Sequence, residues 1–178
     1  VGCALIHVER TDDSGEICDH AVDEIADSYD TESTIAAIKE RYPNNQVWVY
    51  PDASGAKRAS GAKNSLTTRG EPTATDLFRL RQAGFNVIVN YSNPAIKDRT
   101  TAYSARICDA TGRRRYFVNV VRCPNATKTL EQQVWANGIP DKSQGLDHMG
   151  DAGGYVMVKK HPLIKSVTGY AKAENRRY

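Results

Sequence analysis

Residues 47–55 read Val47-Trp48-Val49-Tyr50-Pro51-Asp52-Ala53-Ser54-Gly55. Four uninterrupted apolar residues are typical of a short strand that is covered on both faces of a sheet. The residues from Pro51 onward predict a turn that leaves this sheet. Asp52 would then lie at the carboxyl end of a buried strand, which is where open α/β sheets bind their ligands. A carboxylate that only caps the turn is the alternative interpretation.

The segments on both sides of this run alternate between strand and helix patterns. Alternating apolar positions predict a hairpin of strands 2–8 and 17–25 around a turn at 11–15. Further strands are predicted at 85–89 and 116–121, helices at 30–42, 73–84, 94–110, 127–135 and 146–159, and polar loops at 53–72 and 138–145. This order predicts an α/β fold with a mixed sheet, antiparallel at the hairpin and parallel beyond it.

The composition is that of a globular protein. The chain has 178 residues, of which 40% are hydrophobic and 25% charged, and this length suits one domain of roughly 100–200 residues. Apolar side chains recur throughout, which excludes a disordered chain. No apolar run approaches the ~20 residues that cross a membrane, and the start of the sequence is not typical of a secretory signal.

The net charge of +3 is unevenly distributed along the chain. Residues 1–40 contain eleven acidic and two basic residues, a net charge of −9, whereas residues 41–178 contain twenty-two basic and ten acidic residues, a net charge of +12. The basic excess gathers at 57–69, at 113–122 and in the tail from Lys159 to Arg177. Such clusters are expected of a protein that binds a polyanion, and solvated loops are the alternative interpretation.

The four cysteines, Cys3, Cys18, Cys108 and Cys123, are not arranged in Cys-x-x-Cys pairs. This spacing favours reduced and mostly buried thiols over a zinc site or a disulfide framework. Residues 55–65 contain glycine, lysine and serine in an order that superficially resembles a phosphate-binding loop. The match fails, because Ala62 separates Gly61 from Lys63 and Asn64 stands where the Mg²⁺-binding hydroxyl belongs.

A second acidic motif lies near the carboxyl end, in residues 145–155. On the helix predicted there, Asp147 and Asp151 are separated by four positions, and His148 and Asp151 by three, so the three side chains share one face. Like charges at this spacing repel each other unless a cation neutralises them, and carboxylate oxygens suit a hard divalent cation. Acids that favour the amino-terminal helix dipole are the alternative, which explains Asp147 better than Asp151.

Together these motifs resemble a known family. Residues 47–55, Ala83-Gly84-Phe85, Asn90 and residues 145–155 look like the C-terminal nuclease domain of tailed-bacteriophage terminase large subunits. The resemblance covers nearly the whole chain. It implies a ribonuclease H-like fold, a mixed β-sheet flanked by helices on both faces, over residues 1–160, followed by a basic tail at 161–178.

The resemblance also implies the roles of the acidic residues. Asp52 would be the second carboxylate of a cluster that holds two Mg²⁺ or Mn²⁺ ions, Asp151 the third and Asp147 a supplementary ligand. His148 would order a water or the scissile phosphate. The family's first carboxylate falls upstream of Val1, so we expect the first strand to be truncated at its start. Glu9 and Glu24 are the nearest strand acids that could substitute.

The activity implied is endonucleolytic cutting of concatemeric double-stranded viral DNA during genome packaging, in the host cell cytoplasm and with little sequence specificity. The basic side chains expected to grip the duplex are Lys57, Arg58, Lys63, Arg69, Arg113, Arg114 and Arg115. The implied partners are an N-terminal ATPase domain, a small terminase subunit and a portal protein, with no membrane. Another ribonuclease H-like nuclease, such as a resolvase or integrase core, and a non-catalytic DNA-binding or portal-docking module are the alternatives.

Overall fold

The structure is a computed structural model that describes residues 2–56 and 75–163. The strands in this part of the chain are β1 (Gly2–Thr11), β2 (Ile17–Ser28), β3 (Trp48–Val49), β4 (Asn86–Val87), β5 (Tyr116–Val118), β6 (Trp135–Ala136) and β7 (Ile139–Pro140). The helices are α1 (Thr31–Arg41), α2 (Asp76–Gln82), α3 (Ile96–Ile107), α4 (Pro124–Gln132) and α5 (Asp147–Lys160), with a 3₁₀ turn, η1, over Ala53–Ala56. The fold is therefore mixed α/β, as expected.

The strands of the described residues form three small sheets. β1 and β2 form the predicted antiparallel hairpin, and β5 joins β2 in parallel. β3 and β4 pair in parallel, as expected, but hydrogen-bond only to each other, while β6 and β7 form a short antiparallel pair. The expected single mixed sheet is therefore divided. Each of β3 and β4 contributes only two paired residues.

The strand at 47–50 is covered on one face only, so the prediction of a strand buried on both faces is wrong. Val47 and Val49 pack against a hydrophobic cluster, whereas Trp48 between them is 54% exposed. This alternation is the period of two expected of a strand with one solvated face. Ala4 and Ile6 of β1 and Val87 of β4 pack against the same cluster. The three strands therefore share one core although they do not share one hydrogen-bonded sheet.

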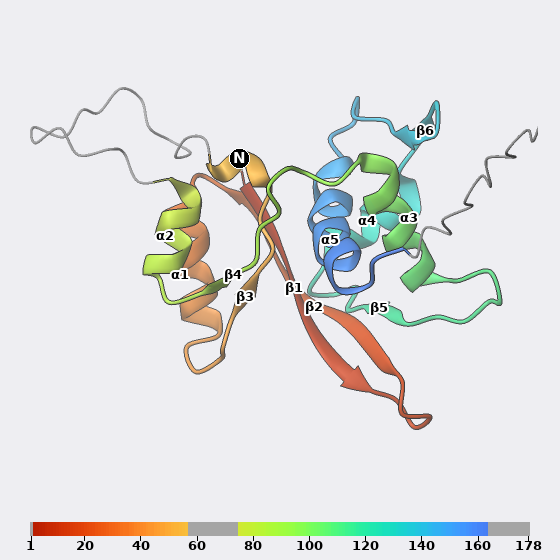
Figure 1. The fold of residues 1–178 in the computed structure, drawn as a ribbon, viewed down its shortest axis with the longest axis horizontal. Coiled ribbons are helices and arrows are strands. Elements are labelled where there is room, and N and C mark those ends of the chain that lie inside the picture. Colours follow the sequence, from red (N-terminus) through yellow and green to blue (C-terminus); the bar gives the residue numbers. More distant parts are fainter. Residues whose placement is uncertain (1, 57–74, 164–178) are drawn as a thin grey trace, which may run out of the picture.

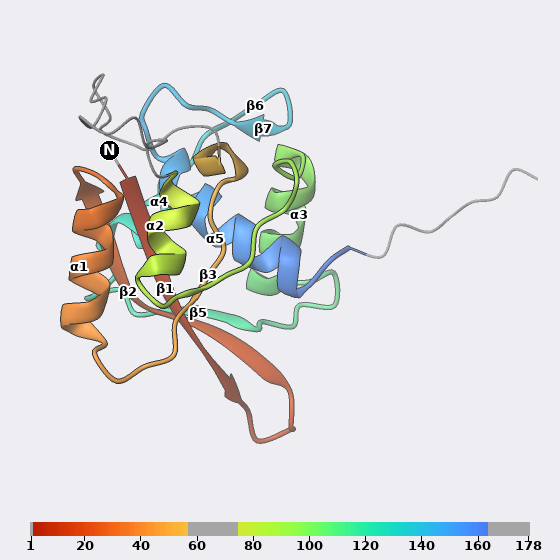
Figure 2. The same cartoon turned by 60° about the vertical axis from the view of Figure 1, so that its left-hand side comes forward.

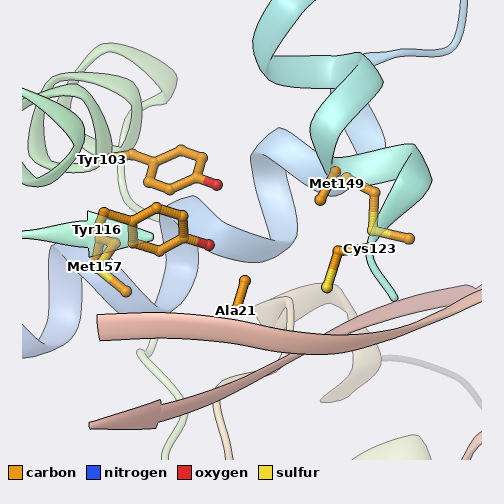
Figure 3. Close-up of a cluster of buried hydrophobic side chains, with 7 residues drawn as sticks. Ala21, Tyr103, Tyr116, Cys123, Met149 and Met157 are labelled. Carbon is orange, nitrogen blue, oxygen red and sulfur yellow. The ribbon is translucent and has the colours of Figure 1, made fainter. Parts of the chain in front are cut away.

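Helices cover both sides of the β1–β2 hairpin. Figure 1 shows α1 and α2 on one side and α3, α4 and α5 on the other. In Figure 2, α1 and α3 again lie on opposite sides of the hairpin. On the first side, Ile35 and Ile38 of α1 and Leu80 of α2 pack with Ile25 of β2. On the second side, Tyr103, Tyr116, Met149, Met157 and Cys123 pack over Ala21 of β2 (Figure 3).

Local sequence signals set the ends of several helices. Asp30 caps α1 by accepting a hydrogen bond from the Ser33 amide at 2.8 Å, and Thr75 caps α2, both within the predicted alternatives. α4 begins earlier than predicted, because Pro124 occupies its first turn, where no amide donor is needed. It also ends earlier, so Trp135 belongs to β6, and the expected loop 138–145 contains β7.

Two glycines of α5 provide a test of how closely the helices pack. A Cβ at Gly153 would lie 2.8 Å from Cζ of buried Tyr103 on α3, whereas one at Gly150 would meet Thr129 at an ordinary 3.4 Å. Overpacking costs ~1–3 kcal/mol and the alanine helix preference returns ~1 kcal/mol. We expect Gly153→Ala to lower the free energy of unfolding in urea and Gly150→Ala to leave it equal or raise it. Equal losses in both variants would contradict this packing.

His7 of β1 makes stability depend on pH. Its Nε2 lies 2.7 Å from the Tyr116 hydroxyl, and burial, together with the charge of Lys160, lowers the pKa of His7 from 6.5 to about 4 against the opposing charge of Asp19. The unfolded imidazole takes up a proton below pH 6.5 and the folded one only near pH 4. The contribution of His7 is thus complete above pH 6.5 and lost as the pH falls to 4.

We therefore expect wild-type protein to lose about 3 kcal/mol more unfolding free energy than His7→Gln between pH 7 and pH 4. Urea unfolding of both proteins at several pH values measures the difference. Carboxylates that titrate in the same range are present in both proteins, so their effect cancels in the comparison. Parallel pH profiles would show that His7 is not the group responsible.

No helix of residues 2–56 and 75–163 combines the length and apolar character that crossing a membrane requires.

The four cysteines are all free. Cys18 and Cys123 are buried, Cys3 is partly buried and Cys108 is exposed.

Candidate functional site

Asp52 is fixed at the end of β3 by its own turn and by the segment after β4. Its Oδ1 accepts hydrogen bonds from the Ser54 amide and from Nδ2 of Asn93, both at 2.7 Å. The Ala53 amide in turn donates to Oδ1 of Asn93 at 2.8 Å. Because β3 and β4 are parallel neighbours, the ends of both strands meet here. Asp52 thus follows β3, one strand of a parallel pair, as predicted, although that strand is not buried on both faces.

The surroundings of Asp52 favour its ionised form. Partial burial alone would raise the pKa of this carboxyl, but hydrogen bonds from Asn93, Ser54 and Tyr155 outweigh that effect and the pKa is lowered. Hydrogen bonds to a carboxylate stabilise its charged form. Asp52 therefore presents a negative charge at neutral pH.

Asp151 reaches the same place from α5, one helical turn before Tyr155. The Tyr155 hydroxyl donates to Oδ2 of Asp52 at 3.1 Å. Burial raises the pKa of Tyr155 to about 12. The charge of Arg99 opposes this shift, and the charges of Asp52 and Asp151 add to it. Tyr155 therefore contacts Asp52 directly and lies one turn from Asp151 on the same helix.

Arg99 of α3 is the cation of this group. Its Nη1 lies 3.1 Å from Oδ1 of Asp151, and its guanidinium carbon lies 4.4 Å from the centre of the Tyr155 ring. Gly154 permits this approach, because a Cβ there would lie 3.2 Å from Cβ of Arg99. We call Asp52, Arg99, Asp151 and Tyr155 the tyrosine-linked site.

Asp147 and His148 lie in the first turn of α5, where the predicted helix begins. Asp147 is 6% exposed and pairs with Nζ of Lys142 at 3.3 Å. His148 is exposed, and its backbone carbonyl accepts a hydrogen bond from the Cys3 thiol at 3.6 Å. Burial raises the pKa of Cys3, and the charges of Asp151, Glu24, Asp147 and Asp27 raise it further. The start of β1 thus faces the acidic side of α5.

A pocket of about 190 Å³ adjoins the acidic residues of α5. Its lining residues come from α3, α4, α5 and the β6–β7 hairpin, and include Thr100, Gln133, Trp135, Asp147 and Asp151. Trp135 is half exposed at this pocket. Asp151 therefore has the tyrosine-linked site on one side and an open pocket on another.

The predicted metal ligands Asp52, Asp147 and Asp151 do not form a compact three-ligand group. In the part of the chain that the structure describes, the group of acids and histidines whose ligand atoms lie within 4.8 Å of one another is Glu9, Asp19 and His161. Lys160 pairs with Glu9 and lies 4.0 Å from Asp19. Basic side chains already neutralise the acids of that group, so it is a cluster of salt bridges rather than an open metal site. Binding of metal at Asp52 and Asp151 stays a prediction.

Neither strand acid considered as a substitute first carboxylate lies free at the site. Glu24 is buried, and both of its oxygens are occupied at the start of α4: Oε1 accepts from the Asn125 amide at 2.8 Å and Oε2 from the Ala126 amide at 2.9 Å. Glu9 lies towards the turn of the β1–β2 hairpin and pairs with Lys160. Both acids therefore have structural partners.

The predicted DNA-contacting residues fall into two groups. Lys57, Arg58, Lys63 and Arg69 lie outside the described residues. Of the arginine run, Arg113 pairs with Glu16 and Arg115 with Asp109, each at 2.5 Å, while Arg114 is exposed and has no partner among the described residues. Glu16 belongs to the hairpin turn, about 25 Å along β1 from Cys3 at the usual strand rise. The run is therefore largely neutralised and remote from the tyrosine-linked site.

The sequence reasoning did not single out Arg99, Tyr155 or Asn93. The sequence does contain a pattern that could have identified Arg99. The buried face of α3 is formed by residues at helical spacing, namely Arg99, Ala102, Tyr103 and Arg106. Arginine at two positions of a stripe that should be apolar indicates buried ion pairs. Tyr155 lies one turn beyond Asp151, on the face already assigned to the acids.

The chain was compared with known protein families, curated proteins and solved structures. It matches no family model, no curated protein and no solved structure.

Proposed function

We propose that this chain is a metal-dependent endonuclease domain that cuts double-stranded viral DNA during genome packaging. The observation that carries the proposal is the chain of contacts that links Asp52 to Asp151 through the Tyr155 hydroxyl and Arg99. Carboxylates gathered from a strand end and a late helix agree with the roles that the terminase resemblance implies. The ribonuclease H-like form of the fold belongs to the same proposal, supported by helices on both sides of the hairpin.

The donor atoms suit the proposed ions, Mg²⁺ or Mn²⁺. Both ions prefer carboxylate oxygens, and the lowered pKa of Asp52 keeps that ligand ionised. Asp52 and Asp151 would hold the ions, with Asp147 one turn away. The chemistry such a pair of ions supplies is activation of a water and stabilisation of the leaving oxygen in phosphodiester hydrolysis.

The chain's own residues would prepare this site. Asn93 and the Ser54 amide hold Oδ1 of Asp52, and the Tyr155 hydroxyl holds Oδ2, so the carboxylate has one orientation. His148 is exposed on the first turn of α5 and is available to order a water or a phosphate oxygen. Arg114, the unpaired member of its run, would contribute to non-specific contact with the duplex backbone.

Nicking of supercoiled plasmid by the purified chain tests the proposal, with Mn²⁺ or Mg²⁺ present in one series and EDTA in another. We expect nicking only with the divalent ion, together with Mn²⁺ binding by calorimetry. If the chain binds DNA but neither nicks it nor binds Mn²⁺, a non-catalytic DNA-binding module would replace the proposal. Cleavage confined to branched junctions would replace it with a resolvase.

A further inference from the structure

Arg99 is a buried cation whose hydrogen-bonding capacity is not used. Its side chain is 6% exposed, and neither Nε nor Nη1 has a hydrogen-bond partner within the described part of the chain. Nη1 lies near Oδ1 of Asp151 at 3.1 Å as an ion pair. A guanidinium has five N–H donors in a planar fork, and leaving buried donors unpaired is unfavourable. Something further is therefore needed to satisfy this side chain.

The surroundings hold Arg99 in one place. The guanidinium lies over the Tyr155 ring at 4.4 Å, and the tight contact between Gly154 and the base of the side chain fixes the stem. Tyr155 in turn donates to Asp52. A chain of contacts thus runs from Asp151 through Arg99 and Tyr155 to Asp52. The Asp151 side chain is 26% exposed, so this chain of contacts meets solvent at its Asp151 end.

We propose that Arg99 contacts a phosphate oxygen of the bound nucleic-acid strand, with Asp151 as its acceptor when no strand is bound. The substrate identity in this inference rests on the proposed function. A phosphate offers paired acceptor oxygens that match the guanidinium fork. It also needs a cation in order to lie beside two carboxylates. Arg99 supplies that charge beside Asp151 and over the ring of Tyr155, whose hydroxyl reaches Asp52.

The test is the salt dependence of DNA binding, measured by fluorescence anisotropy of a short labelled duplex. The buffer contains Ca²⁺, and a gel confirms that the duplex stays uncut. One lost phosphate contact lowers the slope of log K against log [salt] by about 0.9. We expect Arg99→Gln to show this decrease and to bind several-fold more weakly, and Arg99→Lys to retain the slope because it keeps the charge.

Arg41→Gln is the matched control, because Arg41 also pairs with an aspartate, Asp23, but lies outside the tyrosine-linked site. Its slope should equal that of the wild type, and thermal melts confirm that each variant is folded. An unchanged slope in Arg99→Gln, or equal decreases in the glutamine and lysine variants, overturns the inference. Plasmid nicking by the wild type is measured separately. If the wild type does not cut plasmid but the salt slope of DNA binding still depends on Arg99, the nuclease proposal is rejected and the phosphate contact is retained.

Discussion

Asp52→Asn is expected to lower Mn²⁺-dependent plasmid nicking by about 10³-fold, which is the scale of losing one preorganised charged group at a reacting centre. Asparagine keeps the shape of the side chain and one acceptor oxygen, so the contacts to Ser54 and Asn93 have a partial replacement. What disappears is the negative charge that those contacts stabilise. The rate of conversion from supercoiled to nicked plasmid measures the effect, and calorimetry should show weaker Mn²⁺ binding in the same variant.

Asp13→Asn is the control for this substitution. Asp13 is an exposed acid in the turn between β1 and β2, outside the tyrosine-linked site, and the same change of charge there should leave nicking and Mn²⁺ binding as they are. If Asp52→Asn cuts plasmid at the wild-type rate, the carboxylate is not part of the reacting centre, and its hydrogen bonds serve only to shape the turn.

The features that the sequence predicted correctly are those set by neighbouring residues. The β1–β2 hairpin follows from two alternating runs around a turn, and the start of α1 follows from Asp30 three positions before Ser33. The placement of Asp147, His148 and Asp151 on one helix is also local, because it needs only the helix period. The position of Asp52 after a strand belongs to the same class.

The features that the sequence did not predict depend on contacts between distant segments. Arg113 looks like part of a basic patch until folding brings Glu16, 97 residues away in the sequence, beside it. Trp48 looks like a buried strand residue, but it is 54% exposed, because only the face that carries Val47 and Val49 packs against the core. The link from Asp52 through Tyr155 to Arg99 joins three elements, and spacing along the chain carries no information about it.

Arg106→Ala is expected to cause the largest loss of stability. Asp19 is fully buried, and its Oδ2 accepts a hydrogen bond from Nε of Arg106 at 3.0 Å, while Nη2 of Arg106 donates to the Ile17 carbonyl at 2.6 Å. Removing one partner of a buried ion pair costs ~3–5 kcal/mol, because the remaining charge stays buried. For a chain of this length the melting temperature should fall by about 10 °C.

Two comparisons separate this buried pair from ordinary surface pairing. Arg113→Ala removes an ion pair with Glu16 in which the arginine is 57% exposed, and pairs of that kind contribute at most ~1 kcal/mol. The double variant Asp19→Asn with Arg106→Met removes both charges together and should recover much of the loss, because no charge is then left buried alone. A melting temperature of Arg106→Ala equal to that of Arg113→Ala would contradict the assignment. In that case His161 and Lys160, which also face Asp19, would be sufficient to neutralise its charge.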